Sequence, residues 1–278
     1  MALRKRKYLN NRDLLSEISK SKNSYSSYVN PEDAEYDIIL DSIDSVNRNT
    51  ISQARKNRAD RIAKANWEVE AAVAKGVKQD KFSINHLDIP KTDVVFRIKT
   101  FDHVPEEPGR KKNPKTVADH HVKLNFPPYQ HWRLDENDKL FCVGKSHWIG
   151  GMENGYFSLD HGGMTNTLAK MYMVMCERYG SKWNWRGYTY NDEMKSQALL
   201  QLSQVGLQFD ESKSDNPFAY YTATITNSFT RVLNIEKKNQ NIRDDMLESH
   251  GYKSSHTRAL NSHIKWKEET GQRTETGQ

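Results

Sequence analysis

Apolar residues in the second half of the chain recur every three or four positions, which is the spacing of an amphipathic helix. Three such runs follow one another, and Thr189 and Asn216 can cap the second and the third. Their apolar positions are Leu168, Met171, Tyr172, Met175 and Tyr179; Met194, Ala198, Leu202 and Val205; and Phe218, Tyr221, Ile225, Phe229 and Val232. We therefore predict a helical domain over residues 164–250, whose third helix runs from Pro217 to about Lys238.

The N-terminal segment, residues 1–80, is also predicted to be helical. The pattern indicates helices over residues 13–20 and 31–46 and a longer one from Thr50 to Gly76. The longer helix carries a group of basic residues that could track phosphates or form a solvated face. They are Arg55, Lys56, Arg58, Arg61 and Lys64.

Between residues 81 and 163 the pattern changes to alternation interrupted by prolines and glycines, which is typical of strands and turns. Residues 94–99 alternate, and the alternation on both sides of the turn at residues 135–138 predicts a hairpin. Residues 251–278 are predicted to be a flexible tail. The predicted fold class is therefore mainly α, with N-terminal helices and a small β-containing insert.

Composition favours a protein that makes polar contacts. Of 278 residues, 36% are hydrophobic and 28% are charged, and 42 basic residues against 36 acidic ones give a net charge of +6. A polyanion is therefore a plausible partner, and its binding would weaken as the salt concentration rises. Cys142 and Cys176 have no paired spacing, which argues against a disulfide framework or a cysteine-ligated zinc site. The missing disulfide pattern favours a reducing cytoplasm. No apolar run has membrane-spanning length, so we expect no membrane contact.

The junction at residues 209–221 carries the most specific chemistry. An acid-ended helix is followed by a helix that Asn216 can cap and that opens with Phe218, Tyr220 and Tyr221. Every base has a π-face, and stacking on an aromatic side chain contributes roughly 1–3 kcal/mol. The junction therefore predicts a surface that holds DNA bases.

Five short sequences at residues 177–180, 186–189, 209–213, 216–220 and 227–238 occur in a shared order. In that order they resemble the second conserved region of sigma-70-type transcription initiation factors, and most closely the late-transcription sigma factors of T4-type phages in their long cyanophage form. A weaker similarity at residues 7–15 extends the resemblance over nearly the whole chain. The resemblance implies a sigma region-two fold in a non-enzymatic protein with no cofactor and no metal.

The resemblance also implies a docking face for the clamp helices of the largest polymerase subunit. The matching positions are Asp192, Glu193, Lys195, Ser196, Gln197 and Leu199. Lys195 and Ser196 differ from the acidic and amide side chains that primary sigma factors use there. An ordinary exposed helix face is the alternative interpretation of this set.

A second set matches positions that face promoter DNA in the family. It comprises Trp183, Trp185, Phe218, Tyr220, Tyr221, Thr224, Asn227, Ser228, Arg231, Lys237 and Lys238. The resemblance places Tyr221 where the family stacks a flipped non-template adenine, and Ser228 and Arg231 near the upstream duplex edge. The alternative is core packing for each tryptophan and a solvated helix end for the two lysines.

One family feature is missing. Thr224 and Ile225 fall where primary sigma factors have an aromatic wedge that separates the strands. Melting is therefore expected to depend on an easily opened A·T-rich element or on partners, because TA-type steps are the least costly to distort.

The expected function is that of a phage-encoded sigma factor in the cytoplasm of the infected bacterial host. It would bind host core RNA polymerase and direct initiation at late promoters by recognising and melting an A·T-rich minus-ten-type element, including its non-template single strand. A phage coactivator and a sliding clamp are further candidate partners.

Two other functions stay open. One is a polymerase-binding regulator that occupies the sigma site without reading promoters. The other is a metal-dependent nuclease within the insert, whose candidate ligands are His103, His120, His121, His131, His147, His161, Asp119 and Asp160. No two of them have metalloprotease spacing or a cysteine pair nearby.

Overall fold

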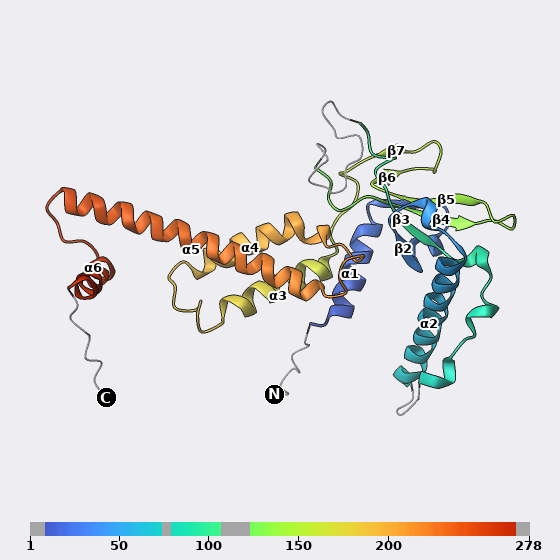
Figure 1. The fold of residues 1–278 in the computed structure, drawn as a ribbon, viewed down its shortest axis with the longest axis horizontal. Coiled ribbons are helices and arrows are strands. Elements are labelled where there is room, and N and C mark those ends of the chain that lie inside the picture. Colours follow the sequence, from blue (N-terminus) through green and yellow to red (C-terminus); the bar gives the residue numbers. More distant parts are fainter. Residues whose placement is uncertain (1–8, 74–78, 107–122, 271–278) are drawn as a thin grey trace. The chain divides into compact units, whose positions relative to one another are not determined.

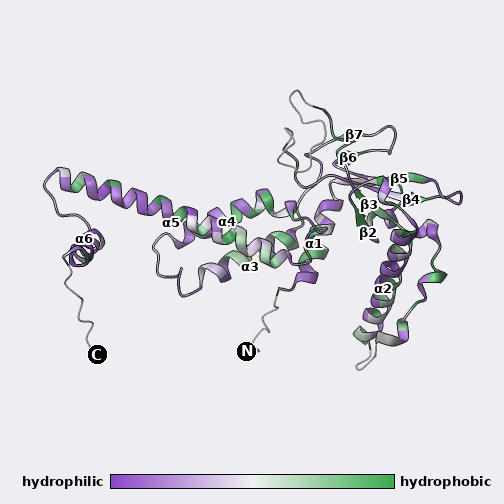
Figure 2. Ribbon diagram, in the orientation of Figure 1, coloured by the Kyte–Doolittle hydropathy of each residue, from purple (hydrophilic) through white to green (hydrophobic). Residues whose placement is uncertain are grey.

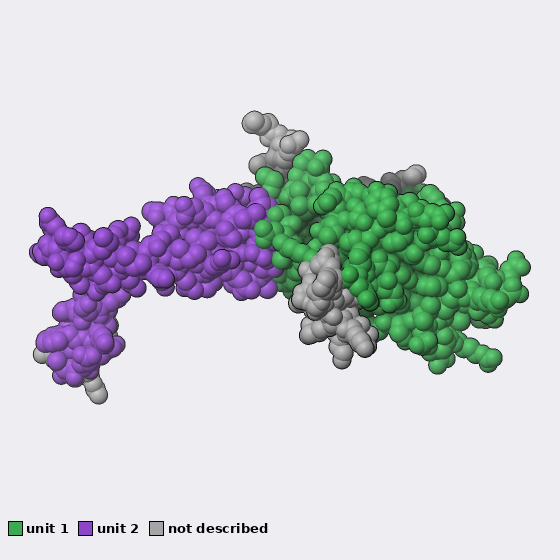
Figure 3. All heavy atoms as spheres, turned by 90° about the horizontal axis from the view of Figure 1, so that it is seen from above, with its two compact units in different colours: residues 1–175, 202–222 green, residues 176–201, 223–278 purple. Residues whose placement is uncertain are grey.

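The structure is a computed structural model that describes residues 9–73, 79–106 and 123–270. It divides into two compact units, shown in Figure 3. Unit 1 comprises residues 1–175 and 202–222, and unit 2 comprises residues 176–201 and 223–278. The described part contains six α-helices and a small mixed sheet, so the mainly α class is confirmed (Figure 1).

A five-stranded sheet lies at the centre of unit 1. Its strands are β1 (Ser26–Tyr28), β2 (Ile38–Leu40), β3 (Phe96–Lys99), β4 (Tyr129–Leu134) and β5 (Leu140–Ser146), in the order β1-β5-β4-β3-β2. Only the β2–β3 pair is parallel. The sheet thus joins two strands from the expected N-terminal segment with three from the expected insert. A separate two-stranded sheet contains β6 (Trp148–Ile149) and β7 (Tyr156–Phe157).

The prediction of a helix over residues 31–46 is wrong. Two short 3₁₀ helices, Pro31–Ala34 and Ile43–Ser45, flank β2 instead. The first is fixed by Asp33, which accepts hydrogen bonds from the Asn30 backbone (3.1 Å) and pairs with Arg133 (3.0 Å). The β-branched pair before Leu40 then extends along β3, because pairing with a buried strand outweighs a weak local helix preference.

The predicted strand and hairpin are confirmed by β3, β4 and β5. The hairpin turn is closed by Asp135, whose carboxylate accepts from the backbone nitrogens of Asn137 and Lys139 at 2.8 Å each. Asp138 supplies the left-handed residue, with φ of 58°. Further 3₁₀ helices span Gln79–Phe82, His86–Asp88 and Lys91–Asp93.

The long helix α2 (Arg48–Val73) confirms the helix predicted from Thr50 and packs on the sheet through fully buried Ala54. The core there contains Leu40, Val94, Phe96, Ile98 and Leu134. Three of the basic residues on α2 are engaged locally. Arg55 donates to the Leu87 carbonyl, and Arg58 and Arg61 pair with Asp37.

Helix α1 (Asn11–Asn23) is tied to the loop before α5 by a buried lysine. The side chain of Lys22 is only 3% exposed, and its Nζ donates to the Phe209 carbonyl and to Glu211, each at 2.7 Å. Burial lowers the pKa of Lys22, and the Glu211 carboxylate opposes that shift. The position of residues 209–211 therefore depends on this ion pair.

The remaining helices are α3 (Asn166–Gly180), α4 (Asn191–Val205), the 3₁₀ helix Gly206–Gln208, α5 (Pro217–Ser249) and α6 (His256–Glu269). Helix α5 continues past the predicted end near Lys238 to Ser249. Helix α6 lies where a flexible tail was expected, and Ser255 caps it by accepting from the Arg258 backbone nitrogen. None of the described helices has the length and apolar character to cross a bilayer.

Candidate nucleic-acid interface

The start of α5 forms as predicted. The Asn216 side chain accepts from the backbone nitrogen of Ala219 at 3.1 Å, and Pro217 is the first helical residue. Asn11 accepts from the Phe218 backbone nitrogen at 3.2 Å, which satisfies a further free amide. Phe218 is 44% exposed on this first turn, so its ring remains accessible.

Tyr221 does not have the predicted accessibility. Its side chain is fully buried, its hydroxyl donates to the Gly206 carbonyl at 3.0 Å, and it accepts from the Tyr172 hydroxyl at 3.0 Å. The two rings meet edge to face at 4.9 Å, and burial raises the pKa of Tyr221. A Cβ on Gly206 would collide with Tyr172, so the packing is close. Neither face of Tyr221 is therefore open to a DNA base in this conformation.

The two tryptophans between α3 and α4 have opposite environments. Trp185 is buried, with its ring 5.3 Å from that of Phe229, so the core-packing alternative describes it. Trp183 is 84% exposed. Of the pair, only Trp183 can offer an aromatic face to a nucleic acid without rearrangement.

A polar stripe, which we define by Asn227, Arg231 and Lys238, runs along α5 in unit 2. Asn227, Arg231 and Lys238, all predicted to contact DNA, line one shallow hollow of about 620 Å³. Their spacing of four and seven residues places them on one face of the helix. Hydrophilic residues dominate the second half of α5 in Figure 2. The structure thus brings together three candidates from the sequence.

The same hollow contains residues that the sequence interpretation missed. Thr230, Asn234 and Ile235 complete its lining. Thr230 and Asn234 lie three and seven residues after Asn227, so extending the helical spacing would have found them. None of the six lining residues is acidic. Amide and hydroxyl groups can read base edges, and arginine and lysine can hold phosphate.

The other predicted DNA contacts on α5 are less available. Ser228 is buried, and its hydroxyl donates to the carbonyl of Thr224 at 3.0 Å. Thr224 and Tyr220 are half-buried, and the Tyr220 hydroxyl donates to the Val205 carbonyl at 2.9 Å. Lys237 is exposed but lines a different hollow. The stripe is therefore narrower than the sequence indicated.

The predicted docking face lies at the start of α4. Asp192, Glu193 and Ser196 are exposed there, whereas Gln197 and Leu199 are half-buried. Lys195 lies 2.7 Å from Asp192 and 3.3 Å from Glu177, and the hydrogen bond to Asp192 raises the lysine pKa. Its charge is therefore partly compensated within unit 2, whereas Glu193 has no ion pair within the part of the chain that the structure describes.

The candidate histidines that the structure describes, His103, His131, His147 and His161, contact protein groups. His131 is buried, its Nδ1 donates to the Asp33 carbonyl at 2.6 Å, and its Nε2 accepts from Arg97 at 2.9 Å. His161 lies beside Tyr25. Among the residues that the structure describes, no three His, Cys, Asp or Glu side chains gather as metal ligands. Asp119, His120 and His121 lie outside the described residues.

Two of these histidines make the stability of unit 1 depend on pH. Burial lowers the pKa of His103 to about 4 and that of His147 to about 3, below the ordinary value near 6.5. Above about pH 6.5 both histidines are neutral in the folded and in the unfolded chain, and the folded state keeps its full stability. As the pH falls from 6.5 towards 4, the histidines of the unfolded chain bind protons that the buried ones do not, so the free energy of unfolding decreases. We expect the free energy of unfolding in urea to fall steadily from pH 7 to pH 4.5.

His147→Asn tests this pH dependence, since asparagine tolerates the left-handed backbone at this position, where φ is 53°. We expect the variant to lose less stability than the wild type over the same pH interval. A pH dependence equal to that of the wild type would exclude His147 as a source.

The chain was compared with protein-family models, with curated proteins and with solved structures, and none of them matched.

Proposed function

We propose that the chain is a promoter-specificity subunit, a phage-encoded sigma factor that joins host core RNA polymerase and acts at late promoters. The observation that carries the proposal is the stripe on α5, where three residues matched to the family's DNA-facing positions line one hollow without an acidic neighbour in its lining. The order of the sequence motifs resembles that of the sigma family and supports the proposal. The net charge of +6 is compatible with a polyanionic partner.

In this proposal the helices of unit 2 have separate roles. The exposed start of α4, with Asp192, Glu193 and Ser196, would meet the clamp helices of the largest polymerase subunit. Arg231 and Lys238 on α5 would hold phosphates, and Asn227 would reach a base edge. Exposed Trp183 would provide a stacking surface for an unpaired base.

Strand separation would rely on the DNA and on partners. Position 224 carries threonine in place of an aromatic wedge, and Tyr221 is buried. An A·T-rich minus-ten-type element opens at low cost, and Phe218 or Trp183 could trap its non-template strand. A phage coactivator and a sliding clamp remain candidate partners, and the site of action would be the cytoplasm of the infected host.

The burial of Tyr221 favours a second candidate, a polymerase-binding regulator that does not read promoters. Such a regulator needs only the docking face on α4, whereas a sigma factor also needs an accessible aromatic side chain and the α5 stripe. The two candidates therefore differ in whether substitutions on α5 change DNA binding.

We expect Arg231→Gln and Lys238→Gln, each of which removes one phosphate contact, to weaken binding to promoter DNA and to lower the salt slope by about 1 each. Fluorescence anisotropy with labelled duplex at several salt concentrations measures both. Arg48→Gln and Lys139→Gln, each made singly, are charge-matched controls on exposed positions of unit 1. Equal binding by the stripe variants and the controls would favour the regulator.

A further inference from the structure

The junction between α5 and α6 is a fixed structure. The Asp244 carboxylate accepts from the Ser255 backbone nitrogen at 2.9 Å and from its hydroxyl at 2.7 Å. These hydrogen bonds lower the pKa of Asp244, so the carboxylate is ionised at neutral pH. Gln240 also donates to the Ser255 hydroxyl at 3.2 Å. The start of α6 is therefore held on α5 by several polar contacts.

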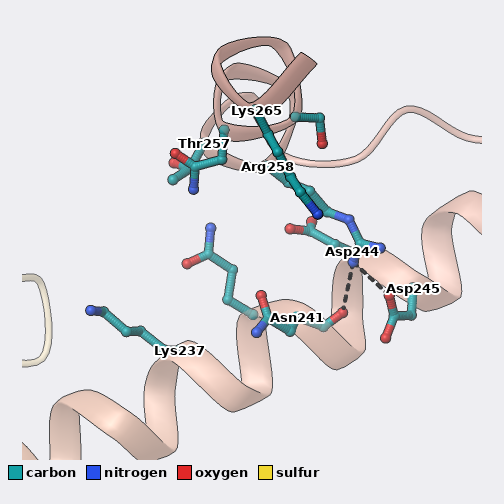
Figure 4. A pocket seen from close by; sticks show the side chains of 10 residues that line it. Lys237, Asn241, Asp244, Asp245, Thr257, Arg258 and Lys265 are labelled. Atoms are coloured by element: carbon teal, nitrogen blue, oxygen red, sulfur yellow. Dashed lines mark hydrogen bonds and ion pairs between the residues drawn. The ribbon is translucent and has the colours of Figure 1, made fainter. Parts of the chain in front are cut away.

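Arg258 makes further contacts with α5, and the dashed lines in Figure 4 mark those with Asp245 and Asn241. Its guanidinium lies 2.5 Å from Asp245 and 3.1 Å from Glu248, and it donates to the Asn241 carbonyl at 3.4 Å. Arg258 thus compensates part of the negative charge of Asp245 and Glu248. Asp244 keeps its charge, because both of its Ser255 donors are neutral, so an anion can bind here only through further cations.

A hollow of about 670 Å³ opens between the two helices. Figure 4 shows lining side chains from both helices; Lys265 and Arg258 point towards Asp244, whereas Lys237 extends away from Lys265. Its lining consists of Lys237, Gln240, Asn241, Asp244, Asp245, Thr257, Arg258, Asn261, Ser262 and Lys265. Every one of these side chains is polar or charged, so the hollow does not suit an amphipathic helix or another apolar ligand. Three are cationic and two are anionic.

The lysines are the cations that the junction leaves available. Lys237 has no ion pair among the described residues, and Lys265 has only a 3.9 Å contact with exposed Glu269. Lys237 belongs to α5 and Lys265 to α6, so each can hold a separate phosphate of a duplex that passes the hollow. The amides of Gln240 and Asn261 add hydrogen-bond donors to the same lining.

The hollow continues the α5 stripe. Residues 227, 231, 234, 238, 241 and 245 are separated alternately by four and three positions, so Asn241 and Asp245 lie on the same helix face as Arg231 and Lys238. Asn241 is about 15 Å beyond Arg231 along the helix. That length corresponds to roughly four base-pair steps of duplex DNA. One duplex along α5 could therefore meet both hollows.

We infer that the α5–α6 hollow is a second DNA contact, which holds the backbone of the duplex next to the element held by the stripe. Lys237 and Lys265 each hold a phosphate of that backbone, and the neutral amides add hydrogen-bond donors. The inference rests on the proposed function, since it needs DNA on α5. It assigns a binding role to α6, where the sequence indicated only a tail.

The test compares the full chain with its Lys237→Gln, Lys265→Gln double variant on two labelled duplexes. One carries the minus-ten-type element with long flanks, and the other lacks the flanking base pairs on both sides. On the long duplex we expect the double variant to bind about tenfold more weakly, with a salt slope lower by about 1–2. On the short duplex the two proteins should bind alike. Lys139→Gln with Lys170→Gln, two exposed lysines of unit 1, is the matched control.

An equal loss on both duplexes, or no loss on either, would overturn the inference. Arg231→Gln separates this failure from failure of the proposed function, because it should weaken binding to both duplexes. Arg231→Gln could have no effect while the lysine variant loses affinity only for the long duplex. That result would support the second DNA contact and contradict the proposed binding of promoter DNA by the stripe. If the wild type binds neither duplex, both proposals fail.

Discussion

Replacing Lys22 by alanine should lower the free energy of unfolding of unit 1 by about 3–5 kcal/mol, because it leaves a largely buried carboxylate without its cation. Lys22 is 3% exposed and Glu211 is 14% exposed, and the lysine also satisfies the Phe209 carbonyl. The loss should appear as a lower midpoint in urea unfolding. Because Glu211 lies just ahead of α5, the variant should also loosen the loop that leads into this helix.

Two comparisons make the Lys22 result specific. Lys20→Ala removes a lysine whose side chain is 62% exposed and paired with Glu17, so it should cost no more than about 1 kcal/mol. Lys22→Met combined with Glu211→Gln removes both charges and should recover at least half of the lost stability. Equal losses for Lys20→Ala and Lys22→Ala would show that the buried pair has no special role.

Tyr221→Ala should lower the free energy of unfolding by about 3–5 kcal/mol, because it removes a fully buried aromatic side chain. Tyr221→Phe keeps the ring but leaves the Gly206 carbonyl and the Tyr172 hydroxyl without their partner, and it should lose about 1–3 kcal/mol. Urea unfolding of the three proteins measures both effects.

The same variants decide between a core role and a stacking role for Tyr221. A base-stacking residue tolerates phenylalanine and, when changed to alanine, impairs promoter opening while the protein remains stable. A core residue shows the stability losses above. Normal stability of Tyr221→Ala together with defective promoter opening would restore the stacking role and would contradict the buried position.

Local signals in the sequence were sufficient to predict several elements of the fold. The Asn216–Pro217 boundary fixed the start of α5, since both the cap and the proline act within one turn. The apolar periodicity placed Ile225 and Phe229 on a buried face, as found. The hairpin followed from alternation around a turn rich in acidic and amide residues.

Elements that depend on distant partners were not predictable from local pattern. Strand β2 is only Ile38–Leu40, and it exists because it pairs with Phe96–Ile98 far along the chain. Helix α6 depends on the contact between Ser255 and Asp244, which no periodicity reveals. Pairing of this kind is set by tertiary structure and overrides weak local preference.

In the candidate site, too, local spacing predicted some features, whereas features that depend on tertiary packing were not predictable. Helical spacing predicted that Asn227 and Arg231 share a face, and the same rule extends to Thr230 and Asn234. Spacing could not separate Trp183 from Trp185, because their burial depends on packing against Phe229. For Tyr221, periodicity indicated the core and the family resemblance indicated DNA, and the structure agrees with periodicity.

The most direct measurement is run-off transcription with host core RNA polymerase on an A·T-rich late-type promoter, with and without the full chain. The proposed function predicts a transcript of defined start that appears only when the chain is present, together with binding of the chain to core polymerase. Core binding without a specific transcript, on a template that a known sigma factor can open with the same polymerase, would contradict the promoter-reading role and leave the regulator.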